Sequence, residues 1–192
     1  VDGEECFYQG YTSGTTGFPK GCIQRHRAFV DHYKRSYRIY GHGAPEIMLI
    51  PGPLFHEAPT LFTLGHLFHG GTVVLLPAFD PVETLAAIER ERCTMLGFAV
   101  PPMLDALVAA TDEHDASSLG SIITAGAPLY EDTMDAVMAR FPQARLHEFY
   151  GATEVGLVTD VVHNDHRDKG RTTGTGGPCV TVVMLADEAN AL

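Results

Sequence analysis

Glycine, hydroxyl and lysine side chains gather in one short stretch near the start of the chain. Residues 11–21 read Tyr-Thr-Ser-Gly-Thr-Thr-Gly-Phe-Pro-Lys-Gly. Glycine has no Cβ, so backbone N–H groups can turn toward an anion and approach it closely. Small hydroxyls add hydrogen-bond donors, and a lysine adds a mobile positive charge. The stretch therefore predicts a loop that wraps a polyphosphate.

This stretch is not a Walker A loop, which needs Gly-x-x-x-x-Gly-Lys-Ser/Thr. Here Gly14 and Gly17 are three residues apart, and Pro19 precedes Lys20. The alternative interpretation is a polar surface turn, because Gly, Ser, Thr and Pro are ordinary loop residues. The candidate nucleotide-binding residues of the stretch are Thr12, Ser13, Gly14, Thr15, Thr16, Gly17 and Lys20.

A second chemically suggestive segment, residues 148–154, reads Glu-Phe-Tyr-Gly-Ala-Thr-Glu. The Tyr150 ring can stack on a purine. The Thr153 hydroxyl can donate to a phosphate oxygen, and the Glu154 carboxylate can hold Mg²⁺ while the metal also binds phosphate. On its own the segment is more typical of a turn with an exposed acid, and the family resemblance described below is what favours the nucleotide site.

The elements that must position these residues follow from the hydrophobic pattern. Apolar runs typical of strands alternate with segments of helical period, which predicts an α/β fold with a largely parallel sheet and flanking helices. Strands are expected at residues 7–12, 47–50, 72–76, 95–100, 121–125 and 146–150. Helices are expected at residues 26–40, 80–92, 103–110 and around 134–141.

The helix after residue 80 has the clearest start signal. Asp80 can cap it, Pro81 suits its first turn, and Glu83 can reach back to the cap N–H. Its inward side is expected to carry Val82, Leu85 and Ala86.

Two glycines mark strand ends. Gly126 and Gly151 each follow an expected strand, and in open α/β sheets ligands bind beyond the carboxyl ends of the strands. These strand ends and the phosphate stretch are therefore compatible with one shared nucleotide site.

The phosphate stretch resembles the phosphate-binding loop of the adenylate-forming superfamily, which contains acyl-CoA synthetases, firefly luciferases and nonribosomal peptide adenylation domains. Every fixed position of that loop is matched, and residues 150–154 are similar to the family's Tyr-Gly-x-Thr-Glu. Residues 126–129 resemble Gly-Gly-Ala-Pro-Leu, with Ala125 in place of the first glycine. Residues 53–56 resemble Pro-Leu-Phe-His-x-x-Gly, with Pro59 in place of the glycine.

The resemblance covers about residues 8–185 and includes a further glycine-rich segment, residues 174–178. It implies that Tyr150 lies against adenine, Thr153 near the α-phosphate, and Glu154 on Mg²⁺. His56, Thr153 and Glu154 are the implied catalytic residues. The implied nucleotide site adds Gly126, Ala127, Pro128, Glu148, Phe149, Tyr150, Gly151 and Thr153 to the phosphate stretch.

The resemblance implies an AMP-forming carboxylate–CoA ligase that activates a fatty or aryl acid as an acyl-adenylate and transfers it to coenzyme A. ATP, Mg²⁺ and coenzyme A are the implied cofactors and co-substrates. The sequence does not choose the acid. Candidate residues of the acid pocket are His56, Phe98, Ala99, Val100, Thr124 and His147.

Residues 1–192 are interpreted as a single fragment of the AMP-binding N-terminal lobe, without the C-terminal catalytic lobe. In the family, a Thr-Gly-Asp segment, an arginine-containing hinge and a C-terminal lysine lie farther downstream. The three lysines of the chain, Lys20, Lys34 and Lys169, match none of these. The isolated fragment is expected to bind ATP weakly and to turn over little, and its uncovered apolar surface to favour self-association.

Composition narrows the function classes. A net charge of −11 argues against a nucleic-acid footprint. The four cysteines show no C-x-x-C pairing, and there is no run of eighteen apolar residues, so we expect a cytoplasmic protein without a membrane span. One alternative is a non-catalytic nucleotide-binding or interaction module derived from the same lobe. Another is a metalloprotein built on His66-x-x-His69 and His163-x-x-His166.

Overall fold

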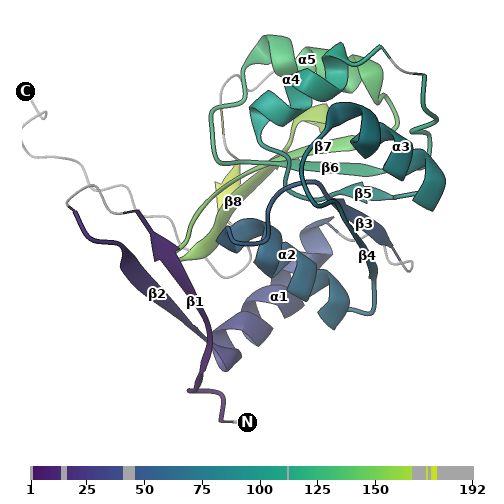
Figure 1. Ribbon diagram of the computed structural model, residues 1–192. Helices are drawn as coiled ribbons and strands as arrows, with labels where there is room; N and C mark the ends of the chain where they lie inside the picture. Colours follow the sequence, from purple (N-terminus) through teal and green to yellow (C-terminus); the bar gives the residue numbers. More distant parts are fainter. Residues whose placement is uncertain are drawn as a thin grey trace, which may run out of the picture.

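The computed structural model describes residues 2–13, 17–40, 46–111, 113–165, 172 and 174–176 (for residues 35–40, 165 and 175, the backbone alone). Within these residues, seven strands form one sheet in the order β4-β3-β5-β6-β7-β8-β9 (Figure 1). The five strands of the parallel part are β3 (Ile47–Ile50), β4 (Thr72–Leu75), β5 (Met95–Leu96), β6 (Ser121–Thr124) and β7 (Arg145–Ala152). The strands β8 (Gly156–Val162) and β9 (Thr175–Gly176) extend it in antiparallel fashion. A short 3₁₀ turn, η1 (His163–Asp165), follows β8.

Helices cover both faces of this sheet (Figure 1). One face carries α3 (Pro81–Glu91), α4 (Pro101–Ala109) and α5 (Glu131–Arg140), and the other carries α1 (His26–Tyr40) and α2 (Glu57–Phe68). Alternation along β3 shows why both layers form: Leu49 packs in the core under α3–α5, whereas Met48 and Ile50 pack toward α2. The predicted α/β fold with a largely parallel sheet is confirmed.

A separate two-stranded antiparallel sheet precedes the main one. It consists of β1 (Cys6–Thr12) and β2 (Lys20–Arg25), and Thr12 pairs with Lys20 at its open end. The chain passes from β2 directly into α1. The phosphate stretch is therefore the connection of a hairpin, whereas the sequence had indicated only the incoming strand.

Local signals predicted most of the helices well. The predicted helix at residues 26–40 is α1, and the Asp80 side chain accepts a hydrogen bond from the Glu83 N–H at 2.9 Å, as a cap should. The inward face of α3 was partly wrong, because Leu85 is buried but Val82 is 40% exposed. The helix instead turns Ala87 and Ile88 toward the core.

Two elements depart from the expected pattern. The strand expected at residues 95–100 ends at Leu96, and Phe98 has a left-handed backbone with φ of 52°. The helix α2 was not predicted at all, and its apolar residues do not follow one clear face because it contacts both the sheet and α1.

Gly65 lets α2 pack closely on α1. A Cβ added at Gly65 would overlap the ring of Tyr33, which is itself buried between the two helices with Phe29 and Leu61. Because a ring in a packed cluster cannot move aside freely, the small residue is required at this contact.

We predict that Gly65→Ala lowers the free energy of unfolding by about 1 kcal/mol, because overpacking costs about 1–3 kcal/mol and better helix propensity returns only about 1 kcal/mol. Urea unfolding measures the change. Gly120→Ala is the matched control, since its Cβ would lie at an ordinary 3.6 Å from the Thr94 carbonyl oxygen. An unfolding midpoint of Gly65→Ala at or above that of the unchanged protein would contradict the close packing.

Candidate functional site

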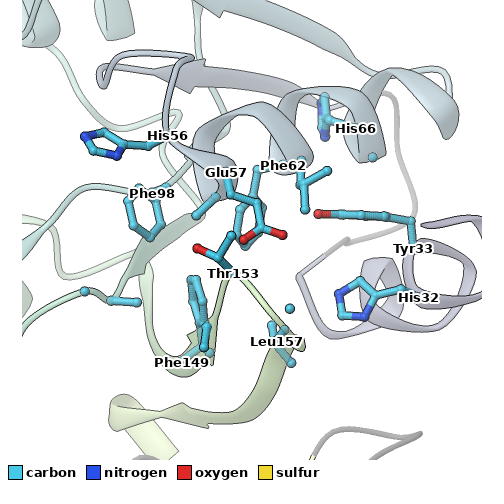
Figure 2. Close-up of a pocket in the computed structure, with 18 of the residues that line it drawn as sticks. His32, Tyr33, His56, Glu57, Phe62, His66, Phe98, Phe149, Thr153 and Leu157 are labelled. Carbon is cyan, nitrogen blue, oxygen red and sulfur yellow. The ribbon is translucent and has the colours of Figure 1, made fainter. Parts of the chain in front are cut away.

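A cavity of about 390 Å³ lies on the face of the sheet that carries α1 and α2. The helices contribute His32, Tyr33, Glu57 and Phe62 to its wall, and the opposite wall comes from segments at the carboxyl ends of the strands. Figure 2 shows these side chains around one central space. The site thus forms where the parallel strands end, as the fold predicts.

Three phenylalanine rings line the apolar part of the cavity. The ring centroids of Phe62 and Phe98 are 6.5 Å apart. The ring centroid of Phe149 lies 5.5 Å from that of Phe62 and 5.9 Å from that of Phe98. The backbone φ of 52° aims Phe98 into this cluster. Gly126, with φ of 85°, follows β6 at the same wall, where an added Cβ would meet Val100 and the Phe98 ring at 3.4 Å and 3.7 Å.

The polar part of the cavity centres on Glu57, the first residue of α2. Gln24 Nε2 donates to Glu57 Oε1 at 2.5 Å, and Thr153 hydrogen bonds to the same carboxylate. Burial raises the pKa of Glu57, the hydrogen bonds from Thr153 and Gln24 oppose that rise, and the Glu154 charge adds to it. Burial also lowers the pKa of His32, so its neutral form is favoured.

The β1–β2 hairpin lies against the turn between β7 and β8. Gln24 Nε2 also donates to the Thr153 carbonyl oxygen at 3.3 Å, and a Cβ added at Gly10 would meet the Thr153 methyl at 3.2 Å. Burial, followed by the charge of Glu154 and a hydrogen bond with it, raises the pKa of the Cys22 thiol. These contacts place the hairpin that carries the phosphate stretch beside the Thr153–Glu154 turn.

The residues of the phosphate stretch are partly described. Ser13, Gly17 and Lys20 are exposed at the open end of the hairpin, and Thr12 is half-buried at the end of β1. The predicted binding residues Gly14, Thr15 and Thr16 lie outside the described residues, as do Gly177 and Pro178 of the second glycine-rich segment.

The second motif forms the end of β7 and its turn into β8. Tyr150 is 56% exposed, and the strand pairing shifts register between Tyr150 and Gly151. An added Cβ at Gly151 would lie 2.5 Å from the Gly156 carbonyl oxygen, so glycine is needed for this close approach. Thr153 lines the cavity, and Glu154 is exposed beside it.

Glu148 has an interior role in the structure. Its Oε2 hydrogen bonds with His163 Nε2 at 2.8 Å, and its Oε1 accepts from the Leu129 N–H at 3.4 Å. The carboxylate therefore connects β7 to η1 and to the turn that contains residues 126–128. Ala127 and Pro128 of that turn are exposed.

The acid-pocket residues predicted from the sequence divide into two groups. His56, Phe98 and Val100 line the cavity. Ala99, Thr124 and His147 are fully buried and are not among the lining residues, which corrects that part of the prediction. The side chains of this second group pack within the protein interior.

Sequence reasoning missed the contribution of α1 and α2 to the cavity. His32, Tyr33, Glu57 and Phe62 carry no motif, and only the helical period of residues 26–40 pointed toward the first two. Glu57 follows His56 directly, so its position beside a predicted catalytic residue was the one available signal.

The two histidines of the first pair considered as metal ligands contact backbone carbonyls. His66 Nε2 hydrogen bonds with the Glu46 carbonyl at 2.9 Å, and His69 Nε2 with that of Tyr33 at 3.0 Å. Within the described part of the chain, no group of three or more His, Cys, Asp or Glu side chains is placed to hold a metal ion. His166 of the second pair lies outside the described residues.

Comparisons with known proteins agree with this geometry. The sequence profile described as AMP-binding enzyme matches residues 1–191. The chain is 33% identical to an uncharacterized acyl–CoA ligase, YhfT, of Bacillus subtilis over 91% of its length and 36% of that protein. It is 34% identical to 4-coumarate–CoA ligase 2 of rice (Oryza sativa subsp. japonica) over 92% of its length and 32% of that protein.

Among solved structures, O-succinylbenzoate coenzyme A synthetase from Bacillus subtilis in complex with ATP and magnesium superimposes with a TM-score of 0.82 at 26% identity. The match covers 92% of this chain and 37% of that one. The chain thus spans about a third of the length of the curated relatives. None of its described helices is long and apolar enough to cross a membrane.

We predict that the free energy of unfolding of Phe98→Gly is about 1 kcal/mol higher than that of Phe98→Ala. The reason is that a left-handed backbone costs an alanine about 1–2 kcal/mol and a glycine almost nothing. Comparing the two variants by urea unfolding cancels the lost ring contacts. At Ala99, whose φ is not positive, Ala99→Gly should instead destabilise. A Phe98→Ala variant as stable as Phe98→Gly would contradict the strained backbone.

Proposed function

Because the chain belongs to the family of AMP-binding enzymes, we propose that it is the nucleotide- and acid-binding part of an AMP-forming ligase that joins a carboxylic acid to coenzyme A. One observation carries the proposal: the hairpin with the phosphate stretch lies against the Thr153–Glu154 turn, and Thr153 also lines the cavity. A nucleotide held between hairpin and turn would present its α-phosphate to an acid in that cavity.

The triphosphate is held by the phosphate stretch, in which Lys20 supplies the positive charge and the glycines and hydroxyls supply donors. The exposed ring of Tyr150 stacks on adenine. The exposed turn at residues 126–128 and Gly151 flank the base, while Glu148 and Phe149 support it from inside the strand.

The chain's residues fit a magnesium ion. Glu154 offers an exposed carboxylate beside the hairpin, and Mg²⁺ is commonly bound by one or two carboxylates together with substrate phosphates. The ion would neutralise charge that develops on the phosphates. The negative charge of this carboxylate also raises the pKa values of Cys22 and Glu57.

The acid enters the cavity with its carboxylate toward His56 and Thr153. A carboxylate oxygen then bonds to the α-phosphorus, the bond from that phosphorus to the bridging oxygen breaks, and pyrophosphate leaves with the electron pair. In the second step the thiol of coenzyme A gives up its proton to solvent and its sulfur bonds to the acyl carbon, the bond from that carbon to the phosphate oxygen breaks, and AMP leaves with the electron pair. Such displacements depend mainly on positioning and on neutralising charge.

The three phenylalanine rings favour an aryl acid over a straight-chain fatty acid. Aromatic pairs gain about 0.5–1.5 kcal/mol beyond the burial of their area. The rice relative is named for 4-coumarate, an aryl acid, which supports the same class. A non-catalytic nucleotide-binding module remains the alternative that the reaction test below separates from a ligase.

We predict that Lys20→Ala weakens Mg-ATP binding about tenfold, because it removes the charge that pairs with the phosphates. Isothermal titration calorimetry on the 192-residue chain measures the dissociation constant. Lys34→Ala is the matched control, since Lys34 is an exposed lysine on α1. Equal loss in both variants would show that Lys20 has no specific role.

The reaction is tested by ATP–pyrophosphate exchange in the whole polypeptide that carries this chain, with a panel of aryl and fatty acids. We expect exchange that depends on an added acid and is fastest with aryl acids. Residues 1–192 by themselves should be at least about a hundredfold slower, because they do not include the family's C-terminal lysine. Losing one preorganised charge costs about 2.7–4 kcal/mol. Nucleotide binding without any acid-dependent exchange would favour the non-catalytic module.

A further inference from the structure

Three segments that are distant in the sequence meet at Glu57. The residue begins α2, Gln24 reaches it from β2, and Thr153 reaches it from the turn after β7. Figure 2 shows the side chains of Glu57 and Thr153 next to each other at the centre of the cavity. The hairpin, the helix and the turn are thus joined through one carboxylate.

Gln24 completes the connection. Its amide nitrogen carries two hydrogens, and it donates to Glu57 Oε1 at 2.5 Å and to the Thr153 carbonyl oxygen at 3.3 Å. The turn is therefore attached twice, once through its backbone to Gln24 and once through the Thr153 hydroxyl to Glu57. Removing Glu57 would leave Gln24 Nε2 with only its longer hydrogen bond, to the Thr153 carbonyl oxygen.

We propose that Glu57 is a positioning residue of the nucleotide site, which sets the spacing between the phosphate-binding hairpin and the Thr153–Glu154 turn; the inference rests on the proposed function. Glu57 does not bind the nucleotide in this arrangement. It acts through Gln24 and Thr153, the two residues whose segments grip opposite ends of the phosphate chain.

The direction of the Thr153 hydroxyl gives the carboxylate a further effect. An ionised carboxylate only accepts hydrogen bonds, so Thr153 donates its single hydrogen to Glu57. A phosphate oxygen must compete for that hydrogen. A glutamine at this position would keep an oxygen for Gln24, and its amide could donate to the Thr153 oxygen and free the Thr153 hydrogen for phosphate.

The environment of Glu57 does not oppose the assignment. A negative charge at the first turn of α2 is stabilised by the helix dipole. The side chain is half-buried, which limits competition from water for its two hydrogen bonds. Alanine favours helices at least as well as glutamate, so replacing Glu57 should leave α2 intact.

The test compares Glu57→Gln with Glu57→Ala by Mg-ATP titration calorimetry. Positioning predicts that Glu57→Gln binds at least as tightly as the unchanged chain, whereas Glu57→Ala binds about tenfold more weakly than Glu57→Gln. A pure charge effect predicts equal gains in both variants, because both remove the same negative charge near the phosphates. Equal affinities of the two variants would overturn the inference.

Gln24→Ala supplies a second arm. It should weaken Mg-ATP binding relative to the unchanged chain, whereas adding it to Glu57→Ala should weaken binding no further, because both residues act through one connection. Additive losses would overturn the shared connection. Glu113→Gln and Glu113→Ala are controls at an exposed glutamate, and both should bind Mg-ATP as the unchanged chain does.

Unfolding experiments separate this inference from the proposed function. In urea, the midpoint shifts of Gln24→Ala and Glu57→Ala should be less than additive in the double variant, whether or not nucleotide is present. If the unchanged chain binds no Mg-ATP, the proposed function fails and the positioning role fails with it. If it binds and Glu57→Ala equals Glu57→Gln, the positioning role alone is refuted.

Discussion

The docking of the β1–β2 hairpin on the β7–β8 turn is the contact on which the site depends. Gln24 and the Thr153 carbonyl are 129 residues apart in the sequence, yet a single hydrogen bond joins them. A two-stranded hairpin is marginally stable by itself, so its place is fixed by such contacts and by its direct continuation into α1. Gly10 also allows the hairpin to pack closely on the turn, because a larger residue at this position would press on the Thr153 methyl.

The features that the sequence predicted well are those whose signals are local. The cap at Asp80 and the helical period of residues 26–40 specify α3 and α1 within one or two turns of chain. The helix α2 escaped detection because its buried residues spread around the helix, and Pro59 in its first turn interrupts the helical reading. The strand at residues 95–100 was overextended because apolar character alone does not reveal the left-handed backbone of Phe98.

The site was predictable in pieces but not as a whole. The phosphate stretch and the segment around Tyr150 each carry a local pattern, and the parallel sheet explains why Gly126 and Gly151 lie at its edge. No local pattern could place Tyr33 or Glu57 in the cavity wall, because their positions depend on how α1 and α2 pack. The contacts that join the pieces are therefore tertiary, and a sequence pattern says nothing about them.

The two halves of the site differ in how firmly they are held. On β7, His147 hydrogen bonds with Asp160 of β8 at 3.3 Å, and its neighbour Glu148 with His163 at 2.8 Å. Successive side chains point to opposite faces of a strand, so β7 is fastened on both faces just before Tyr150. The hairpin has no comparable buried pair among the described residues, and half-buried Gln24 supplies its polar contact to the turn. Among the described residues, the β7 side of the site is therefore held by buried polar pairs, whereas the hairpin side depends on the contacts of Gln24. Under the proposed function, contacts that hold β2 in place would raise nucleotide affinity more than equal contacts added to β7, because preordering a binding segment reduces the conformational entropy lost on binding.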